Sequence, residues 1–441
     1  MKKNLLAYKE SMELMSQKRL YAWLSLSAFV LRIVYISFFG DPMSGPDADT
    51  YSSVAERVLV HGPFTSAQQI PYWPIGYPWF VALVLSISGG SYLLLSVAQI
   101  LIFSLALYCY CCLLSEFLSK KICILSGVLF GLNPAIIVAS TQLMYEIPQI
   151  SLIIIGFWTL RKSLYYRSQK IIYYLMGFLA LLLLVFASVM QLKVTPIFLV
   201  ALYLIVKSKK IFHATGNGLA SLVSLVLFFS LVLPPLVISL RNVQAGDGLG
   251  VSKNYQVHVG FGLSEAGIKS NCVNPSTNGY DDPRYIACLQ IQKLKSPQKG
   301  LFSVTKQFFD LATPYIGVIK WLENGNGTWY HGIDFRRTIR MLGETFWSQI
   351  WKPIDFILSG LWMSSLLFLV TLGINFSYAD KNLQSTLGFQ FLRYSLLSLV
   401  LVSVLGDGDS RHRLTMIPLY LPFIILALLR IRRDFRKNSE F

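Results

Sequence analysis

Long apolar runs separated by short polar links dominate the pattern of this chain. The runs have spanning or near-spanning length and cover residues 21–39, 91–114, 122–140, 147–160, 171–190, 194–206, 218–240, 354–374, 391–405 and 414–429. A straight helix needs about 20 apolar residues to cross a bilayer, so the shorter runs would have to include flanking residues. The pattern predicts an all-α polytopic membrane protein with about ten transmembrane helices, and leaves eleven or twelve open.

A further apolar stretch, residues 77–88, is too short to span a bilayer and is stopped by Gly89 and Gly90. We interpret this stretch as a helix that lies at the membrane interface, within the first of two long outer loops. The alternative is one half of a broken span.

The composition agrees with a membrane protein. The 441 residues are 54% hydrophobic and 14% charged, and the mean hydropathy is +0.54, which is atypical of a soluble enzyme. The net charge of +17 does not indicate nucleic-acid binding, because the basic residues are scattered among apolar runs and form no single basic face.

The basic residues also predict the orientation of the helices. Lys and Arg near span ends are retained on the cytoplasmic side, and alternate links contain Lys2, Lys3, Lys9, Lys18, Arg19, Lys120, Lys121, Arg161, Lys162, Arg167, Lys170, Lys207, Lys209, Lys210, Lys381, Arg393, Arg430, Arg432, Arg433, Arg436 and Lys437. The short segments on the opposite side hold only Arg57, Lys193, Arg411 and Arg413. We therefore expect both termini in the cytoplasm. The first run lacks a small-residue cleavage site and should remain as an anchor.

Two outer segments are too long to be simple connections and suggest folded structure. The chain then divides into an N-terminal transmembrane region (1–240) whose first outer loop is 40–79, an extracytoplasmic cap (241–351), and C-terminal transmembrane helices with a basic tail (352–441).

The six cysteines fall into two groups. Cys272 and Cys288 lie in the cap, on the side where disulfides persist, so we expect a bridge between them. The other group lies at the inner end of a helical hairpin without a nearby His, and we expect small buried residues rather than metal ligands at Cys109, Cys111, Cys112 and Cys123.

Several common functional motifs are missing from the sequence. It contains no GxxxxGK[ST] or GxGxxG phosphate loop and no HExxH zinc motif, so nucleotide-driven transport and zinc proteolysis lack their usual support. No internal repeat or pair of matching interrupted helices favours a secondary transporter.

Candidate catalytic carboxylates lie just beyond the first apolar run. Asp47 and Asp49 are at a membrane face, where an acid costs desolvation energy unless it stays wet, pairs with a cation or serves chemistry. A plain solvated loop acid is the alternative. Glu146 begins the run after Asn133 and Pro134, where the helix N-terminus would stabilise its charge; an ordinary acid at a helix N-terminus is again the alternative.

Cations gather near the same face. Arg411, His412 and Arg413 precede the last apolar run, and the planar fork of arginine suits a phosphate oxygen pair. Lys193 lies in a short outer turn, where it would snorkel regardless of function. Arg241 and Asn242 follow Pro234–Pro235 at the mouth of the cap.

Outward carboxylates, outward cations and a cap suit a reaction on a lipid phosphate with an attached sugar. One carboxylate would act as general base on an acceptor hydroxyl, while the cations stabilise the leaving phosphate. This combination indicates a membrane-face transferase that needs no soluble nucleotide sugar.

At these residues the chain resembles the type C glycosyltransferases, specifically the bacterial protein-mannosyltransferase-like and aminoarabinose-transferase-like group, which is glycosyltransferase family 39-like. Its first outer loop is similar to the family's at Asp47, Tyr51, Ala55, Gly62 and 74–78. The resemblance extends to Pro234–Pro235 with Arg241–Asn242, and to Arg411–His412–Arg413 with Pro418.

The resemblance implies a multi-pass enzyme of the bacterial plasma (inner) membrane with an extracytoplasmic active site. It would move a hexose or pentose, with inversion, from a polyprenyl-phosphate-linked donor to an envelope glycan, lipid or protein acceptor. By position, Asp47 is the base, Asp49 the competing base and Glu146 a second acidic contributor. The donor phosphate would be held by Arg411, Arg413, Lys193 and His412, and the substrate contacted by Tyr51, Tyr77, Arg241 and Asn242.

Two features leave the details open. Some relatives bind a divalent metal ion at the acidic motif, and Asp47, Asp49 and Glu146 carry the hard oxygen ligands that could bind one. The Asp-Ala-Asp sequence at 47–49 departs from the Asp-Glu typical of protein mannosyltransferases, which leaves the acceptor class open. The alternative functions are a lipid-linked oligosaccharide polymerase or ligase, and a transporter or flippase for polyprenyl-linked sugars.

Overall fold

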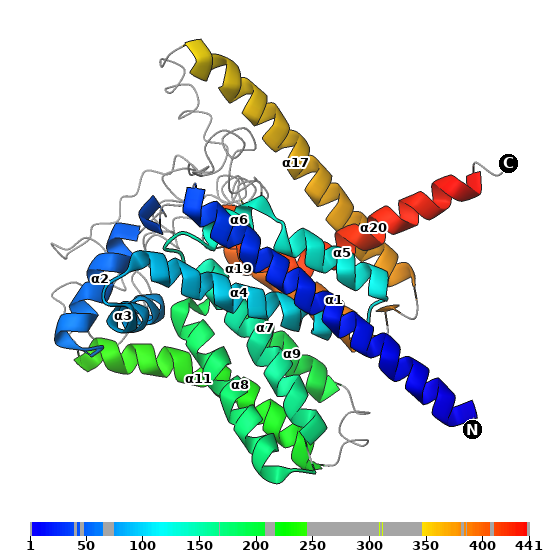
Figure 1. The fold of residues 1–441 in the computed structure, drawn as a ribbon, viewed down its shortest axis with the longest axis horizontal. Coiled ribbons are helices and arrows are strands. Elements are labelled where there is room, and N and C mark those ends of the chain that lie inside the picture. Colours follow the sequence, from blue (N-terminus) through cyan, green and yellow to red (C-terminus); the bar gives the residue numbers. More distant parts are fainter. Residues whose placement is uncertain are drawn as a thin grey trace, which may run out of the picture.

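The computed structural model describes residues 2–38, 42–44, 48–64, 75–166, 168–207, 217–244, 308, 311, 346–380, 383–384, 386–405 and 410–438. Within these ranges the regular elements are all helical, so the predicted all-α fold is confirmed. In chain order the elements (Figure 1) are α1 (Lys2–Phe38), η1 (Pro42–Ser44), α2 (Ala48–His61), α3 (Gly76–Ser88), α4 (Tyr92–Leu114), α5 (Lys120–Gly131), α6 (Pro134–Ala139), α7 (Glu146–Ser163), η2 (Leu164–Tyr166), α8 (Lys170–Met190), η3 (Leu192–Val194), α9 (Thr195–Lys207), α11 (Asn217–Gln244), α17 (Phe346–Ala379), α19 (Leu387–Leu405), η5 (Ser410–Met416) and α20 (Ile417–Asn438).

Six of the described helices are long and apolar enough to cross a membrane, judged by length and composition alone. They cover Ser16–Phe38, Tyr92–Leu114, Lys170–Met190, Leu222–Gln244, Gly360–Ala379 and Arg413–Asp434. The apolar helices Gly76–Ser88 and Leu387–Ser403 are shorter. The expectation of about ten spans stays a prediction, because helices such as α9, with 13 residues, are too short to cross a bilayer alone.

One expected span, residues 122–140, is not a continuous helix. α5 ends at Gly131, and α6 begins at Pro134 after Asn133, whose side-chain oxygen accepts a hydrogen bond from the Ile136 amide at 3.2 Å. Proline has no amide hydrogen and disfavours helical geometry at the residue before it, so Asn133–Pro134 starts a new helix.

A fully buried arginine supports this break. The Arg32 side chain donates hydrogen bonds to the Ala28 and Gly131 carbonyls, both at 2.9 Å, and to the Ser140 hydroxyl at 3.1 Å. Its guanidinium also lies 4.0 Å from the centre of the Phe103 ring. Since the last carbonyls of α5 have no partner within the helix, the Arg32 cation both satisfies Gly131 and complements the helix dipole.

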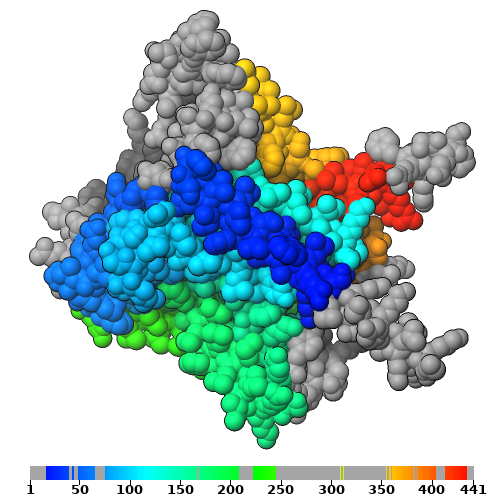
Figure 2. Space-filling view, viewed as in Figure 1, coloured from blue at the N-terminus to red at the C-terminus, as the bar shows by residue number. Residues whose placement is uncertain are grey.

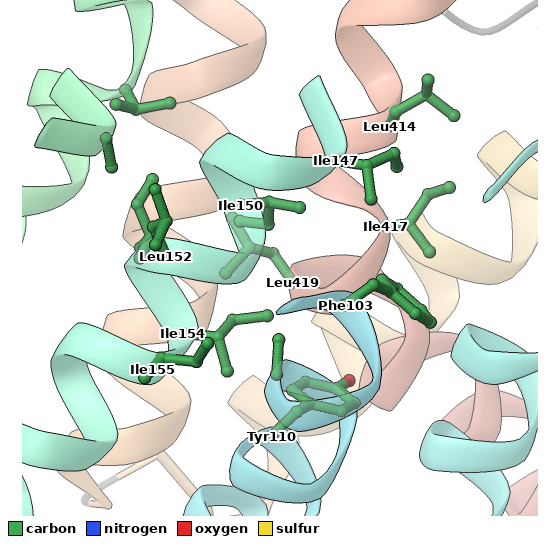
Figure 3. Packing of buried hydrophobic residues seen from close by; sticks show 14 of the residues in the cluster. Phe103, Tyr110, Ile147, Ile150, Leu152, Ile154, Ile155, Leu414, Ile417 and Leu419 are labelled. Atoms are coloured by element: carbon green, nitrogen blue, oxygen red, sulfur yellow. The ribbon is translucent and has the colours of Figure 1, made fainter. Parts of the chain in front are cut away.

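The core lies between α4, α7 and α20. Figure 3 shows Phe103 and Tyr110 of α4 near Ile150 and Ile154 of α7 and near Leu419 of α20. Tyr110 also donates a hydrogen bond to the Pro418 carbonyl at 2.8 Å. That carbonyl lies four residues before Pro422, which cannot donate the usual helical hydrogen bond, so the tyrosine replaces the missing donor.

Two glycines allow close approach of neighbouring helices. A Cβ on Gly373 of α17 would lie 2.0 Å from the Phe423 carbonyl oxygen of α20, and a Cβ on Gly76 of α3 would lie 2.4 Å from the Val189 carbonyl carbon of α8. No side chain fits at either position. From their crossing, α17 and α20 extend away from the other helices (Figure 1).

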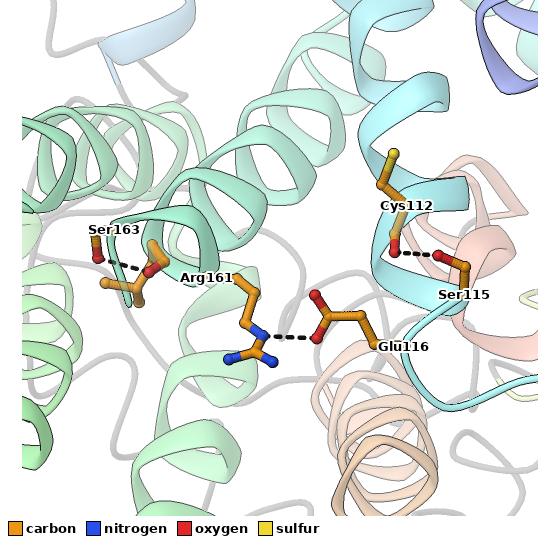
Figure 4. A network of polar contacts seen from close by, with 6 residues as sticks. Cys112, Ser115, Glu116, Arg161 and Ser163 are labelled. Carbon is orange, nitrogen blue, oxygen red and sulfur yellow. Dashed lines mark hydrogen bonds and ion pairs between the residues drawn. The ribbon is translucent and has the colours of Figure 1, made fainter. Parts of the chain in front are cut away.

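An ion pair connects two elements at the end of the helices where many basic residues lie. The Arg161 Nε and the Glu116 carboxylate are 2.6 Å apart and join the link after α4 to the last turn of α7 (Figure 4). On the outside, α1 covers parts of α4 and α5 (Figure 2). Near the same end, Cys109, Cys111 and Cys123 are buried free thiols and Cys112 is half-buried, as expected.

The expected cap begins and ends within helices. α11 continues to Gln244, and α17 already starts at Phe346. Between them only Phe308 and Leu311 are described, so Cys272, Cys288 and their expected bridge lie outside the described residues. The predicted first outer loop contains α2 and the first residues of α3. Their position at the membrane interface and the proposed division of the chain stay predictions.

Candidate active site

One face of α2, in the first outer loop, is buried. Ala48, Tyr51 and Ala55 of this helix are buried, whereas Asp49 in its first turn is exposed. This one-sided burial follows from the helical spacing of the three apolar residues. Asp47 directly precedes the first helical residue and lies outside the described residues, so its role stays a prediction.

Three tyrosines meet behind α2. The rings of Tyr51 and Tyr77 pack edge to face with centroids 4.8 Å apart, and the ring of Tyr145 lies 6.5 Å from that of Tyr51. All three side chains are buried. Edge-to-face packing fixes the relative orientation of the rings, so the start of α2, the start of α3 and the residue before α7 are held as one unit.

A glutamine inside α4 connects this unit to the segment that leads into α7. The Tyr77 hydroxyl donates to the Gln99 side-chain oxygen at 2.9 Å, and the Gln99 amide donates to the Gln142 carbonyl at 2.8 Å. Two further bonds hold the same segment, from the Ser96 hydroxyl to the Thr141 carbonyl at 2.6 Å and from the Leu143 amide to the Pro42 carbonyl at 2.9 Å.

This segment positions Glu146. Glu146 is the first residue of α7, as expected, and its side chain is only 1% exposed. Burial, followed by the charge of Glu146, raises the pKa of the Tyr77 hydroxyl well above its usual value. The hydroxyl therefore stays protonated at neutral pH and remains a hydrogen-bond donor.

Arg413 lies on a segment that packs against the same helix. η5 contacts α7, and Figure 3 shows Leu414 of η5 in the same region as Ile147 of α7. Arg413 is 5% exposed. The backbone of Arg411 and His412 lies in η5, while their side chains lie outside the described residues.

The remaining predicted residues lie on other elements. Lys193 is half-buried in η3, which contacts α19. The preceding end of α8 is held by Gln149 of α7, whose amide donates to the Ala187 and Gln191 carbonyls at 2.8 and 2.7 Å. Arg241 and Asn242 are buried in the last turn of α11 and bond to each other at 3.0 Å.

The described residues contain no group of three or more His, Cys, Asp or Glu side chains that could hold a metal ion. The expected ligand set includes Asp47, which lies outside them, and Asp49 is exposed while Glu146 is buried. A metal ion at Asp47, Asp49 and Glu146 therefore stays a prediction.

Sequence reasoning missed three polar residues of this region, Gln99, Gln149 and Arg32. Each lies inside or near an apolar run and is buried in the structure. The sequence signal that could have identified them is a single polar residue among apolar neighbours, because a polar side chain within a hydrophobic span needs a partner or a function. Their partners are too distant along the chain to be inferred from local pattern.

Comparison of the sequence with protein-family models and with curated proteins finds no match. The structure, by contrast, resembles the Archaeoglobus fulgidus oligosaccharyltransferase. The crystal structure tethered to an acceptor peptide gives a TM-score of 0.51 at 13% identity and covers 95% of this chain and 50% of that chain. The apo crystal structure gives 0.50 at 13% identity, with 96% and 51% covered.

These values define a shared fold. The chain spans about half the length of the two solved structures. The likeness is one of fold, and membership of the type C glycosyltransferases stays a prediction. The protein-mannosyltransferase-like group stays a prediction.

Proposed function

We propose that this protein is a membrane glycosyltransferase that moves a sugar from a polyprenyl-phosphate-linked donor to an acceptor hydroxyl at the extracytoplasmic face. One observation carries the proposal. The start of α2, which follows Asp47, packs through the rings of Tyr51, Tyr77 and Tyr145 onto the segment before α7. Glu146 begins α7, and η5, which includes Arg413, contacts that helix. This packing, together with the fold likeness to an oligosaccharyltransferase, supports a single site that combines acids and cations.

In the proposed reaction Asp47 accepts the proton of the acceptor hydroxyl, and the oxygen of that hydroxyl attacks the anomeric carbon of the sugar. The bond between that carbon and the phosphate oxygen breaks, and the electron pair leaves with the lipid phosphate. Attack from the side opposite the leaving group inverts the anomeric centre. Asp49 is the competing base, two residues further along.

The cations stabilise the leaving group. Arg411 and Arg413 would bind the phosphate oxygens through their planar forks, with Lys193 and His412 as further donors. Negative charge on the phosphate grows as the sugar departs, so these contacts strengthen towards the transition state. Glu146 would orient the acceptor, and Tyr51, Tyr77, Arg241 and Asn242 would contact the sugar or the acceptor. A divalent ion bound by the carboxylates would add electrostatic stabilisation of the phosphate.

The fold also favours a second candidate. One of the similar structures is an oligosaccharyltransferase tethered with an acceptor peptide. A lipid-linked oligosaccharide donor and a peptide acceptor are therefore the alternative to a single sugar and an envelope glycan or lipid. Both reactions break the same type of bond and need the same carboxylate and cations. A flippase, by contrast, would need no general base.

Mass spectrometry of lipid-linked sugars and envelope glycans, in cells with and without the gene, tests the proposal. Loss of the protein should remove one glycan modification and cause its polyprenyl-linked donor to accumulate. The mass of that donor distinguishes a monosaccharide from an oligosaccharide. Loss of the same modification with the donor lipid retained at the cytoplasmic face would instead indicate transport, and an unchanged glycan profile would contradict the proposal.

A further inference from the structure

Arg393 of α19 is buried without a hydrogen-bond acceptor for two of its nitrogens. The side chain is 2% exposed, and neither Nε nor Nη1 has a partner among the described residues. Two more exposed arginines differ, because Arg161 pairs with Glu116 and Arg430 with Asp434. Asp380, the acid at the end of α17, accepts a hydrogen bond from the Leu383 amide at 3.3 Å.

Two tyrosines line the guanidinium. Its central carbon lies 3.7 Å from the ring centre of Tyr378 in α17 and 5.3 Å from that of Tyr394 in α19. A ring stacked on a guanidinium compensates its charge in part, but it leaves the N–H groups in the guanidinium plane unsatisfied. A buried cation with open N–H groups is costly, and an anion with two oxygens would relieve that cost.

The position of Arg393 identifies the kind of anion. Tyr378 is the second-last residue of α17, and Arg393 lies in the second turn of α19. The start of α19 contacts the link between α4 and α5, where the rings of Phe389 and Phe117 are 6.1 Å apart. Lys120 and Lys121 begin α5 directly after this link. Tyrosine and basic residues at helix ends are typical of headgroup depth.

We propose that Arg393, stacked on Tyr378, binds the phosphate of an anionic phospholipid in the leaflet at the basic ends of the helices. The guanidinium would donate its free in-plane N–H groups to two phosphate oxygens. Cations at the same helix ends, such as Lys120 and Lys121 at the start of α5, disfavour a headgroup that carries its own positive charge. The site is independent of the proposed sugar transfer, which takes place at the opposite ends of the helices.

Native mass spectrometry of the full chain tests the site. The protein would be exchanged from detergent into nanodiscs of phosphatidylcholine alone or with phosphatidylglycerol, then released for counting of retained lipids. The wild type should retain phosphatidylglycerol over phosphatidylcholine. Arg393→Gln should lower that retention about tenfold or more, the scale of one lost charge-assisted bidentate contact. The matched control Arg430→Gln removes an exposed charge that already has a carboxylate partner, and should retain the lipid.

Several results would overturn the site. The wild type could retain phosphatidylglycerol and phosphatidylcholine equally. Arg430→Gln could lose as much phosphatidylglycerol as Arg393→Gln does, or Arg393→Gln could retain as much as the wild type. If Arg393→Gln does not fold, Arg393→Lys and Tyr378→Leu decide the matter, because lysine lacks the planar fork and leucine removes the ring. Both should lose retention, and wild-type retention in both would contradict the proposal. If inorganic phosphate, titrated into phosphatidylcholine nanodiscs, raises the melting temperature as phosphatidylglycerol does, the ligand is a soluble anion.

Discussion

The Tyr77 hydroxyl lies 2.9 Å from the Gln99 side-chain oxygen, deep between α3 and α4. Because the Gln99 amide also reaches the Gln142 carbonyl at 2.8 Å, one buried side chain joins the first outer loop to the segment before Glu146. A glutamine can donate and accept at once, which no apolar residue of similar size can do. Gln99 therefore acts as a positioning residue for the candidate site, through Tyr77 and through the segment that ends at Glu146.

Replacing Gln99 by Leu should destabilise the protein and slow the reaction. The change removes the side-chain acceptor of the buried Tyr77 hydroxyl and one donor to the Gln142 carbonyl, which keeps the Met144 amide at 2.9 Å, at a cost of about 1–3 kcal/mol in the free energy of unfolding. In a double-mutant cycle with Tyr77→Phe, unfolding should give a coupling energy of about 0.5–1.5 kcal/mol.

A second glutamine provides the control for that change. Gln390 donates an exposed hydrogen bond to the Gln384 carbonyl at 2.9 Å. Gln390→Leu should change the free energy of unfolding by less than about 0.5 kcal/mol, as usual for exposed positions. A coupling energy of zero between Gln99→Leu and Tyr77→Phe would show that the two side chains act independently.

Tyr110→Phe should destabilise the protein by about 1 kcal/mol, because the Pro418 carbonyl loses its donor. The cost should be smaller in a Pro422→Ala background, where the backbone amide of residue 422 can donate to that carbonyl instead. Thermal unfolding of the two single variants and the double variant measures the difference. An equal cost of Tyr110→Phe in both backgrounds would refute the explanation that proline creates the need for tyrosine.

Gly373→Ala should destabilise the α17–α20 crossing by about 1–3 kcal/mol, since the added methyl group collides with the Phe423 carbonyl. Gly360 lies in the same helix with no atom within 4 Å of an added Cβ. Gly360→Ala should therefore be neutral or stabilising by up to about 1 kcal/mol. Melting temperatures of the two variants distinguish a packing effect from helix propensity, and equal shifts would count against close packing at Gly373.

The sequence predicts much of this fold because hydrophobic length and helix-start chemistry are local. The run at 91–114 corresponds to α4, and Glu146 begins α7 as its place before an apolar run predicts. The break between α5 and α6 was also visible as Asn133–Pro134, yet the apolar residues on both sides suggested one span. Arg32 donates a hydrogen bond to the Gly131 carbonyl at this break, and the hydrophobicity of the sequence does not predict such a bond.

The candidate site is less predictable, because its connections join distant parts of the chain. Gln99 bonds to residues 22 and 43 positions away, and no local pattern specifies such pairs. The tyrosines were individually recognisable, but their edge-to-face contact depends on how α2 folds back onto α3. Residues such as Arg241 and Asn242 were grouped with the site by resemblance, whereas their described contact is with each other.

Cysteine labelling in intact cells tests the predicted orientation. In a background without the native cysteines, Ser44→Cys and Ser276→Cys should react with a membrane-impermeant maleimide, while Asn438→Cys should react only after permeabilisation. The reason is the excess of Lys and Arg on one side of the helices, which marks the cytoplasmic face. Labelling of Asn438→Cys in intact cells would reverse the assignment.

Arg413→Ala should weaken donor binding and also slow turnover, because the phosphate gains charge as the sugar leaves. Arg413→Lys should recover only part of the loss, since lysine keeps the charge without the two parallel donors. Donor titrations that yield kcat and KM separately measure both effects. Equal activity of the Lys variant and the wild type would show that charge alone is sufficient at this position.

The most direct test of the proposed transferase is single-turnover transfer by Asp47→Asn, measured with the purified protein and its lipid-linked donor. Removing the proton acceptor with little change in shape should lower turnover about 100-fold or more and leave donor affinity nearly unchanged. If Asp49→Asn inactivates and Asp47→Asn does not, the base is two residues further along and the reaction class survives. Full turnover by both variants would contradict the transferase account.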